Sequence, residues 1–518
     1  MINHKNIIRI TLLFAVLLGF TTSVYADKNL TILHTNDTHA HLIPFDDPDH
    51  GTNCGGLVRR AGLINLIKKE VENPLILDAG DIFQGTTFFT IFQGEASYRT
   101  AKAIGVEATT VGNHELDLGI EHLLSVIDKT GMRVLASNVV WPDGRKHVFQ
   151  PYAVFVRNGL KIGVIGRVGH DNWADCNIKV TNKMKLLDDI ENIRETAKRI
   201  RPYVDLVVVI SHAEVENDRK MAASISEIDV VIGGHSHTKI MKPELIKNNE
   251  KAGNYDNGLG GTIFTEAYEW GHYLGRIDLT VDDNKKITKW GGELIEVKPE
   301  HEAYATKGIK DLVEYYDQSR IKQISRVIAH SENGLPYDKK LRSKKMCPAG
   351  VFTCDALKSV FNTDIGMINA KGVRCPIPAG NVIVDDVHTM LPFDNDVAVV
   401  VLKGDEVQKM LDHVAKIWEK KSSTVVSGVS GELYVDEGKA RNVKINGQPI
   451  NPDKEYSIAV TSFIADGNDG GDVFFAKPVS MKSTGVIMRD AVISYMEQMK
   501  ELPNIDYEPM TIVRNGSK

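Results

Sequence analysis

Five short apolar runs lie in the first half of the chain, and most end beside glycine, asparagine or aspartate. They occupy residues 30–33, 74–77, 108–111, 206–210 and 228–232. Runs of this length and composition indicate buried β-strands. Helical patterning is predicted between them, at residues 57–71, 118–129 and 184–201. This alternation predicts a largely parallel sheet, in which ligands bind beyond the carboxyl ends of the strands.

Side chains that can bind metals follow all five runs. They are Asp37, His39, Asp81, Asn113, His212, His235 and His237. Carboxylate and neutral imidazole suit zinc, manganese and similar ions, and a carboxylate can bridge two ions. Seven such side chains are too many for one zinc-sized ion, so the pattern predicts a site for two divalent metal ions. Asp37 and His39 can share an ion only if the chain turns sharply beyond the strand.

The second half of the chain has its own strands and helices. A charged segment at 296–325 suits a connecting helix and linker. Beyond it, strands are predicted at 365–368, 397–401 and 456–460, helices at 405–420 and 486–499, and a hairpin turn at Asn446-Gly447. With 518 residues the chain is too long for one core. We therefore expect domains at 27–298 and 326–518, joined by a hinge helix at 299–325.

The first 26 residues resemble a signal peptide. Lys5 and Arg9 precede a short apolar core at 10–20, and Val24-Tyr25-Ala26 has the small-residue pattern of a cleavage site. The apolar core is too short to span a bilayer comfortably, and the end of the chain is polar. We expect an exported protein, periplasmic or secreted after cleavage near Ala26, without a stable membrane anchor.

Charge and cysteine content narrow the remaining possibilities. The formal net charge of −6 does not favour binding to a nucleic-acid polymer. The five cysteines are Cys54, Cys176, Cys347, Cys354 and Cys375. Three of them fall between 347 and 375, which predicts one disulfide there in an oxidising compartment.

Four motifs carry a family resemblance. They are Leu33-His34-Thr35-Asn36-Asp37-Thr38-His39, Asp78-Ala79-Gly80-Asp81, Gly112-Asn113-His114-Glu115-Leu116-Asp117 and Gly234-His235-Ser236-His237. In this order they resemble the calcineurin-like metallophosphoesterases, specifically the 5′-nucleotidase family. The resemblance implies an α/β protein with an N-terminal four-layer α/β/β/α metallophosphoesterase sandwich and a C-terminal α/β nucleotide-binding domain.

The resemblance also implies roles for individual residues of the first domain. One metal would take Asp37, His39, Asp81 and His237, and the other would take Asp81, Asn113, His212 and His235, with Asp81 as the bridge. His114 and Asp117 match a catalytic pair, in which the carboxylate holds the imidazole and raises its pKa. Glu115 is expected to point away from the site, as a cap or an ion-pair partner.

The second domain is expected to bind the nucleotide. From the residues alone, Phe393 and Phe463 fit either core aromatics or rings presented to a base. The resemblance places both rings at base-stacking positions and Asp469 at a ribose-binding position. It also assigns substrate contacts to Asn369, Arg374, Asn395 and Gly428. Among the basic residues at 339–345, Arg342 is the expected phosphate ligand, because guanidinium binds phosphate in a bidentate manner.

The resemblance implies a dimetal 5′-nucleotidase that cleaves phosphate from nucleoside 5′-monophosphates, with nucleotide as its partner and Zn²⁺, Mn²⁺ or similar ions as cofactors. UDP-sugars and nucleoside di- or triphosphates are further possible substrates. Where relatives have a glycine run, this chain has Ala370-Lys371-Gly372, which leaves the preferred nucleotide open. The alternatives are a 2′,3′-cyclic-nucleotide phosphodiesterase with 3′-nucleotidase activity and, in another class, an inactive exported nucleotide-binding protein.

Overall fold

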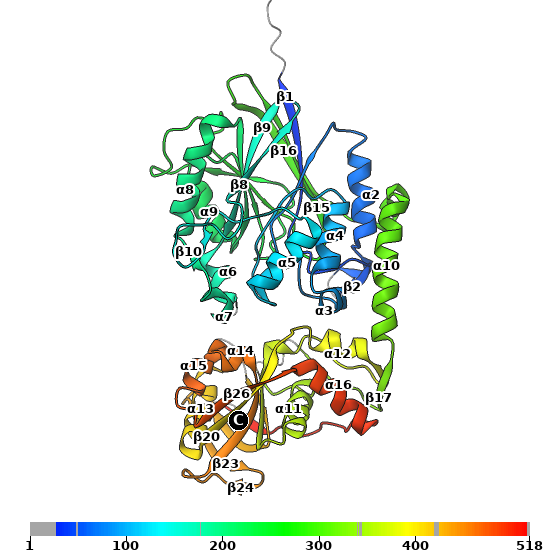
Figure 1. Cartoon of the computed structure of the whole chain (residues 1–518), viewed down its shortest axis with the longest axis vertical. Coiled ribbons are helices and arrows are strands. Elements are labelled where there is room, and N and C mark those ends of the chain that lie inside the picture. Colours follow the sequence, from blue (N-terminus) through cyan, green and yellow to red (C-terminus); the bar gives the residue numbers. More distant parts are fainter. Residues whose placement is uncertain are drawn as a thin grey trace, which may run out of the picture.

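The computed structural model of the chain describes residues 27–47, 50–176, 178–338, 340, 344–418 and 424–514. They form two bodies stacked along the long axis of the molecule and joined on one side by a single long helix, α10 (Lys307–Ile324) (Figure 1). The predicted signal peptide lies outside the described residues. Within them, no helix combines the length and the apolar character needed to cross a bilayer.

Two mixed sheets form the centre of the N-terminal body. The first has the order β16 (Ile287–Glu296), β15 (Tyr273–Val281), β1 (Lys28–Thr35) and β4 (Leu75–Asp78). The second has the order β13 (Glu244–Lys247), β14 (Gly261–Glu266), β12 (Val230–Gly233), β11 (Leu206–His212), β9 (Leu160–Val168) and β8 (Tyr152–Arg157). A parallel pair, β5 (Thr109–Thr110) and β6 (Val134–Leu135), continues from β4 through a bridge between Leu77 and Ala108.

The prediction of one largely parallel sheet is therefore wrong. Strands β1 and β4 are parallel to each other but belong to a different sheet from β11 and β12. An apolar run shows that a strand is buried, but it does not show which strand pairs with it, because the pairing is made over long sequence separations.

Alternation along the strands builds four layers. Leu30 and Ile32 of β1 share a buried cluster with Val208 and Ile210 of β11, so the two sheets pack face to face. The neighbouring side chains point the other way, as successive side chains of a strand do. Leu33 of β1 packs with helices α2 (Leu57–Ile67), α4 (Glu95–Ala103) and α5 (Ile120–Thr130). Val207 and Val209 of β11 pack with α8 (Asp189–Ile200) and α9 (Val215–Ser224), which completes the α/β/β/α sandwich.

Most predicted helices and strands are present, with shifted ends. The helix predicted at 184–201 begins only at Asp189, because Lys185–Leu186 form strand β10 beside β7 (Val139–Val140) and the side chain of Asp188 caps the helix by accepting from Glu191 N. The remaining short elements of this body are β2 (Phe45–Asp47), β3 (Gly51–Cys54), α3 (Thr87–Phe92), α6 (His170–Asp175), α7 (Ile178–Thr181), and the 3₁₀ turns η1 (His114–Leu116), η2 (Arg201–Tyr203) and η3 (Pro299–Tyr304).

The C-terminal body has a separate core, which extends from Ile324 to Met510. Its five-stranded sheet has the order β21 (Thr424–Ser427), β18 (Ile365–Asn369), β25 (Glu455–Thr461), β20 (Asp396–Lys403) and β26 (Ser480–Ile487). A second sheet has the order β24 (Gln448–Pro449), β23 (Lys439–Ile445), β22 (Val429–Tyr434) and β27 (Met510–Val513). The predicted hairpin is confirmed, since Ile445 pairs with Gln448 across Asn446-Gly447.

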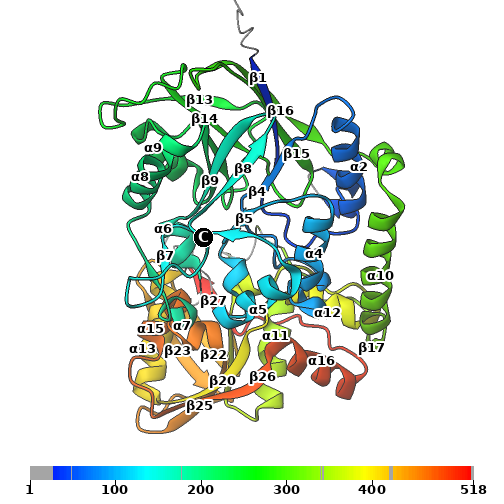
Figure 2. The same ribbon diagram turned by 45° about the horizontal axis from the view of Figure 1, so that its top comes forward.

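Helices cover this body and link it to the first. They are α11 (Pro348–Val360), α12 (Val384–Met390), α13 (Gly404–Ile417), α14 (Ser462–Ala465), α15 (Gly471–Phe474) and α16 (Met488–Met499), with a strand pair, β17 (Val327–Ser331) and β19 (Gly380–Ile383), and two 3₁₀ turns, η4 (Ala370–Gly372) and η5 (Asn468–Gly470). Helix α10 runs down one side of the molecule to β17 in both views (Figure 2).

The prediction of one disulfide among Cys347, Cys354 and Cys375 is wrong. All five cysteines lie in the described residues, and none forms a disulfide. Cys347 precedes α11 and Cys354 lies within it, so the helix separates them by roughly 10 Å along its axis, beyond the reach of a disulfide. The buried thiol of Cys354 instead donates to Val425 O at 3.3 Å.

A buried arginine holds β9, β11 and two helices together. The side chain of Arg167 is 1% exposed, and its guanidinium donates to Ser211 Oγ at 3.1 Å, to Asp189 Oδ2 at 2.5 Å and to Asp218. Ser211 immediately precedes His212, so this network fixes the end of β11. Removing the cation would leave buried carboxylates without their partner.

Substituting Arg167→Met should therefore lower the free energy of unfolding by about 3–5 kcal/mol. Urea unfolding followed by circular dichroism measures the change. Arg99→Met is the matched control, because Arg99 makes an exposed i,i+4 pair with Glu95, and its loss should cost less than about 0.5 kcal/mol. Equal effects of the two substitutions would contradict a structural role for the Arg167 network.

Candidate metal centre

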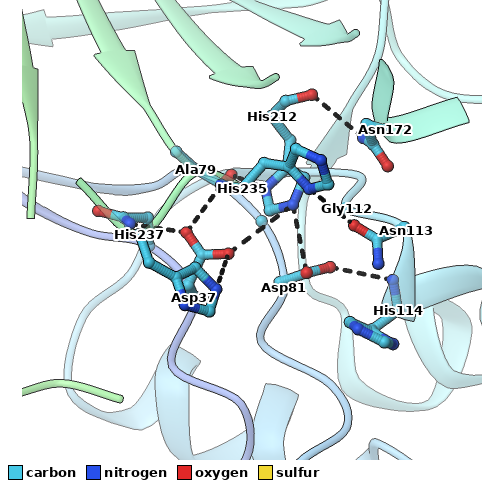
Figure 3. Close-up of polar contacts among 12 residues, drawn as sticks. Asp37, Ala79, Asp81, Gly112, Asn113, His114, Asn172, His212, His235 and His237 are labelled. Atoms are coloured by element: carbon cyan, nitrogen blue, oxygen red, sulfur yellow. Dashed lines mark hydrogen bonds and ion pairs between the residues drawn. The ribbon is translucent and has the colours of Figure 1, made fainter. Parts of the chain in front are cut away.

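The seven predicted ligands meet at one edge of the N-terminal body, where strands of both sheets end. Asp37 and His39 follow β1, Asp81 follows β4, and Asn113 follows β5. His212 is the last residue of β11, and His235 and His237 follow β12. Figure 3 shows the carboxylates of Asp37 and Asp81 near each other, beside the rings of His212 and His235.

Left-handed backbone conformations bring these side chains together. Asp37, His39, Asp81, His235 and His237 all have positive φ, between 44° and 75°. For residues other than glycine this conformation costs of order 1–3 kcal/mol, and it is concentrated at functional sites. It supplies the sharp turn that lets Asp37 and His39 face the same point. Backbone bonds from Asp37 N to Gly80 O (2.9 Å) and from His39 N to Asp81 O (3.0 Å) hold the two turns side by side.

Two glycines allow the loops to approach this closely. A Cβ at Gly112 would overlap Asp81 Oδ1, although φ at this glycine is not positive. Gly80 has φ +92°, and a Cβ there would lie 2.8 Å from Nδ1 of His212. Both positions therefore require glycine if the carboxylate and the imidazole are to keep their places.

The first group of ligand atoms surrounds Asp37. His237 Nε2 lies 3.3 Å from Asp37 Oδ1 and 3.2 Å from His39 Nε2. His39 Nδ1 faces Phe83 O at 3.2 Å, which favours the tautomer that leaves Nε2 with its lone pair. Two ring nitrogens that face each other beside a carboxylate oxygen suit a shared cation.

The second group surrounds Asp81. His212 Nε2 lies 3.2 Å from Asp81 Oδ2, and His235 Nδ1 lies 3.0 Å from Asn113 Oδ1. Asp81, His212 and His235 also place one ligand atom each within 4.8 Å of one another. His39 Nε2, from the first group, lies 3.9 Å from the same Asp81 oxygen. Asp81 thus lies between the two groups, as a bridging carboxylate would.

Unsatisfied atoms show that these residues fit metal ions. Asp37 Oδ1 and His212 Nε2 are buried and have no hydrogen-bond partner among the described residues. His212 Nδ1 faces Ala79 O at 2.7 Å, so its proton is held there and Nε2 is available. Buried acceptors without donors are costly, and a cation at each of the two groups would satisfy them.

The electrostatics of the edge also favour a cation. Burial alone would lower the pKa of His212, but the charges of Asp81 and Asp37 outweigh it and raise the pKa to about 10. Burial likewise opposes ionisation of Asp37, yet His237 and His212 lower the pKa of this carboxyl to about 2. The carboxylates are therefore ionised at neutral pH and require positive charge nearby.

Glu115 caps backbone N–H groups, one of the two roles expected for it, and it does so between the loops that carry the predicted ligands. Its side chain is buried and accepts the backbone N–H groups of Asp81 (2.9 Å), Ile82 (2.9 Å), Phe83 (3.2 Å) and Gly112 (2.7 Å). It therefore joins the loop after β4 to the loop after β5. Burial, followed by the charge of Asp81, raises the pKa of Glu115 to about 8.

Two further acidic residues support the loop after β12, and the sequence reasoning missed both. Glu266 accepts from Ser236 Oγ (2.9 Å) and from Thr238 N (2.6 Å). Glu269 forms an ion pair with Nδ1 of His237. Both lie in or just beyond β14, about 30 residues after the ligands, and only their position near another strand end could have indicated them.

His114 and Asp117 form a pair beside the ligands. His114 Nδ1 lies 2.9 Å from Asp117 Oδ2, and His114 N donates to Asp81 Oδ1 at 3.0 Å. Burial by itself would lower the pKa of His114, but the charges of Asp117 and then Asp81 raise it to about 9. The imidazole is thus held in its cationic form at neutral pH.

The C-terminal body presents an aromatic ring to this pair. The ring of Phe393 stacks on His114 with centroids 6.2 Å apart and an interplanar angle of 26°. The guanidinium of Arg374 lies 5.8 Å from the same ring. Phe393 and Arg374 therefore meet the metal edge from the other body.

The remaining predicted substrate residues are only partly brought together. Asn369 Nδ2 donates to Asp469 Oδ2 at 3.0 Å, which joins two of them across β18 and η5. Phe463 packs against the C-terminal core and makes no ring contact with Phe393 within the described part of the chain. Asn395 O accepts from Met488 N, and Gly428 lies at the turn between β21 and β22. Arg342 falls outside the described residues.

Comparisons with known proteins match both parts of the chain. Residues 30–239 match the calcineurin-like phosphoesterase family, and residues 327–476 match the 5′-nucleotidase C-terminal domain. A 5′-nucleotidase of Vibrio cholerae is 28% identical over 91% of each chain, and an apyrase of Aedes albopictus is 26% identical over 98% of each. The crystal structure of a 5′-nucleotidase precursor from Thermus thermophilus has a TM-score of 0.74 at 28% identity, and the match covers 94% of this chain and 99% of that one. The two domain matches together span more than half of the chain, which thus belongs to the 5′-nucleotidase family of the calcineurin-like metallophosphoesterases and is a metal-dependent phosphoester hydrolase.

Proposed function

We propose that the chain is an exported dimetal 5′-nucleotidase that removes phosphate from nucleoside 5′-monophosphates. The observation that carries this proposal is the contact between the two bodies: Phe393, from the C-terminal domain, stacks on His114 beside the metal ligands. A flat base held by a ring at this place would present its 5′-phosphate to the loop edge. The similarity to a Vibrio cholerae 5′-nucleotidase over most of both chains supports the same substrate class.

Two divalent ions suit the ligand atoms. One would be held by Asp37, His39, Asp81 and His237, and the other by Asp81, Asn113, His212 and His235. Imidazole and carboxylate ligands are those that Zn²⁺ and Mn²⁺ accept. Such a pair of ions supplies Lewis acidity that stabilises charge in phosphate-ester cleavage. The protein contributes the turns, the backbone bonds and the Glu115 bracing that fix the ligands.

His114 would act on the substrate directly without being a metal ligand. Its Nε2 atom carries a proton at neutral pH because Asp117 holds Nδ1 and keeps the ring cationic. This N–H group would donate to a phosphoryl oxygen or to the leaving oxygen and stabilise the charge that develops there. Asp117 would fix both the orientation and the protonation of the ring.

The C-terminal domain would bind the nucleoside. Phe393 and Phe463 would stack on the base, Asp469 would bind the ribose with Asn369 as its neighbour, and Arg374 would bind phosphate. Asn395 and Gly428 would contact the substrate, and Arg342 would be a second phosphate ligand. The exposed Lys371, three residues before Arg374 in the chain, adds a positive charge to the same loop, which would attract the phosphate of the substrate.

Helix α10 would be the hinge between domains 27–298 and 326–518. Arg320 of this helix donates to Thr87 Oγ1 of the first body at 3.1 Å and lies 3.6 Å from Asp385 of the second. Contacts of one side chain with both bodies would stabilise the arrangement in which Phe393 meets His114. The segment at 1–26 would direct export and be cleaved near Ala26.

Removing divalent metal should abolish hydrolysis of AMP, because the buried carboxylates and imidazoles would lose the ions that stabilise the reaction. Phosphate release would be measured after EDTA treatment and again after adding Mn²⁺ or Zn²⁺, which should restore it. Full activity in exhaustively metal-free protein would rule out dimetal catalysis.

The same assay decides among substrates. Rates on AMP, ADP, ATP, UDP-glucose and 2′,3′-cyclic AMP would be compared at equal concentration, and AMP should have the highest kcat/KM. A higher value for 2′,3′-cyclic AMP would assign the chain to the cyclic-nucleotide phosphodiesterases instead. Tight binding of AMP without turnover of any of these compounds would indicate an inactive binding protein.

Replacing Asp117 with asparagine should lower kcat by about 10–100-fold and move the alkaline limb of the pH–rate profile to lower pH. The raised pKa of His114 means that its charge is present at neutral pH and is lost as pH rises through about 9. Without the charge of Asp117 the proton is lost at lower pH. Asp128→Asn, on the exposed face of α5, is the control and should keep the wild-type profile. An alkaline limb at the wild-type pH in the Asp117→Asn variant would exclude a catalytic pair in which Asp117 keeps His114 protonated.

Truncating Phe393 to alanine should raise KM for AMP by roughly 5–100-fold, since base stacking on an aromatic ring contributes about 1–3 kcal/mol. The rate on glycerol 2-phosphate, which has no base, should change much less. Phe393→Tyr is the conservative control and should retain most of the affinity for AMP. Equal losses on both substrates would show that Phe393 supports the metal edge rather than the base.

A further inference from the structure

A second group of metal-binding side chains lies outside the proposed dimetal edge. Asp47 ends β2, His50 lies in the turn before β3, and His272 directly precedes β15. His272 Nε2 lies 2.9 Å from Asp47 Oδ2, and His50 Nδ1 lies 3.4 Å from Asp47 Oδ1. The rings of His50 and His272 have centroids 4.6 Å apart.

The 3.4 Å between His50 Nδ1 and Asp47 Oδ1 suits two ligands of one tetrahedral ion, and an ion bound there would replace the 2.9 Å hydrogen bond between His272 Nε2 and Asp47 Oδ2. Imidazole nitrogens and carboxylate oxygens bind Zn²⁺ at about 2.0–2.2 Å, which places two ligands roughly 3.3–3.5 Å apart. The three residues each place one ligand atom within 4.8 Å of the other two. Three protein ligands with one open position form a common zinc arrangement.

Burial makes this cluster different from a chance surface group. Asp47 is 6% exposed and His272 is 4% exposed, whereas the side chain of His50 is 22% exposed and closes the group on the solvent side. His50 Nδ1 is itself buried and has no hydrogen-bond partner among the described residues. A polar atom in that state, 3.4 Å from a carboxylate oxygen, is directed at a position that a cation would fill.

Aromatic rings surround the cluster. Phe45 packs edge-on against His272 with centroids 5.0 Å apart, and Tyr268 lies 5.2 Å from the ring of His50. Such an apolar shell limits solvent access and strengthens the attraction between ligands and ion.

The cluster lies on the segment that supports the catalytic edge. Glu269, three residues before His272, forms the ion pair with His237. Trp270 N donates to Asp37 O at 2.7 Å, and the Trp270 ring stacks on His41 with centroids 5.0 Å apart. Fixing His272 to the β2–β3 hairpin would therefore hold the segment 268–272 against the loop that carries Asp37.

We propose that Asp47, His50 and His272 bind one additional divalent transition-metal ion of the Zn²⁺ type, separate from the dimetal edge. With three protein ligands, the fourth position would be taken by water, and the ion would act by holding the backbone in place. It would pin the β2–β3 hairpin to segment 268–272 and so fix the backbone on which Asp37 and the partner of His237 depend.

The test is the Zn²⁺ content of the holoenzyme, measured by inductively coupled plasma mass spectrometry after equilibration with Zn²⁺ and desalting. His50→Gln and Asp47→Asn should each hold about one Zn²⁺ per chain less than the wild type. His330→Gln, a half-exposed histidine of the C-terminal body paired with Glu501, is the matched control and should hold the wild-type amount. Because the result is a difference in bound metal, it is independent of whether the chain hydrolyses AMP.

Equal Zn²⁺ in all four proteins would overturn the proposal and leave the contact between Asp47 and His272 as a hydrogen bond. A second measurement uses the wild-type protein, so its result does not depend on whether a variant folds. Crystals grown with Zn²⁺ should show an anomalous peak at the zinc edge between Asp47, His50 and His272. The absence of that peak, with peaks present at the Asp81 edge, would equally overturn the proposal.

Discussion

The burial of negative charge at the meeting point of two sheets is the constraint on which the rest of this structure depends. Asp37 and Asp81 are almost wholly buried, where an isolated carboxylate would be expensive. Several neighbouring groups offset the negative charge of the two carboxylates. Asp37 accepts from His235 N and Asp81 from His114 N, and the imidazoles of His237 and His212 lie beside them. The remaining ligand positions suit cations. The strained left-handed turns persist because the surrounding bonds hold them in place.

Several buried side chains around these carboxylates hold the surrounding loops and strand ends in place. Glu115 gathers four backbone N–H groups from two loops, and Arg167 fixes the end of β11 from behind. Glu266 and Glu269 hold the loop that carries His235 and His237. Each of these groups acts on a ligand through the backbone or through another side chain. The positions of the proposed ligands are therefore fixed by the protein itself, which is the preorganisation that metal sites and electrostatic catalysis require.

The contact between the bodies rests on few residues. Phe393 and Arg374 approach His114 from the C-terminal body, while Arg320 of α10 contacts Thr87 and Asp385 on either side. The two cores are separate, so the relative position of the bodies depends on α10, on these polar and aromatic contacts, and on Ile91 of α3, which packs against the C-terminal core. A contact of this kind can rearrange without disturbing either core, as the proposed entry of a nucleotide between the two domains would require.

The sequence by itself determined the elements and the chemistry of the edge. Apolar runs located the strands, and the residues after them supplied the metal-binding side chains, because both signals are local. Only the tertiary structure decided how the strands pair, since β1 and β11 look alike as sequences but belong to different sheets. It also decided the role of Glu115, the supporting positions of Glu266 and Glu269, and the failure of Cys347 and Cys354 to pair. Those outcomes depend on which loops meet in space, and contacts between distant segments leave no periodic signal in the chain.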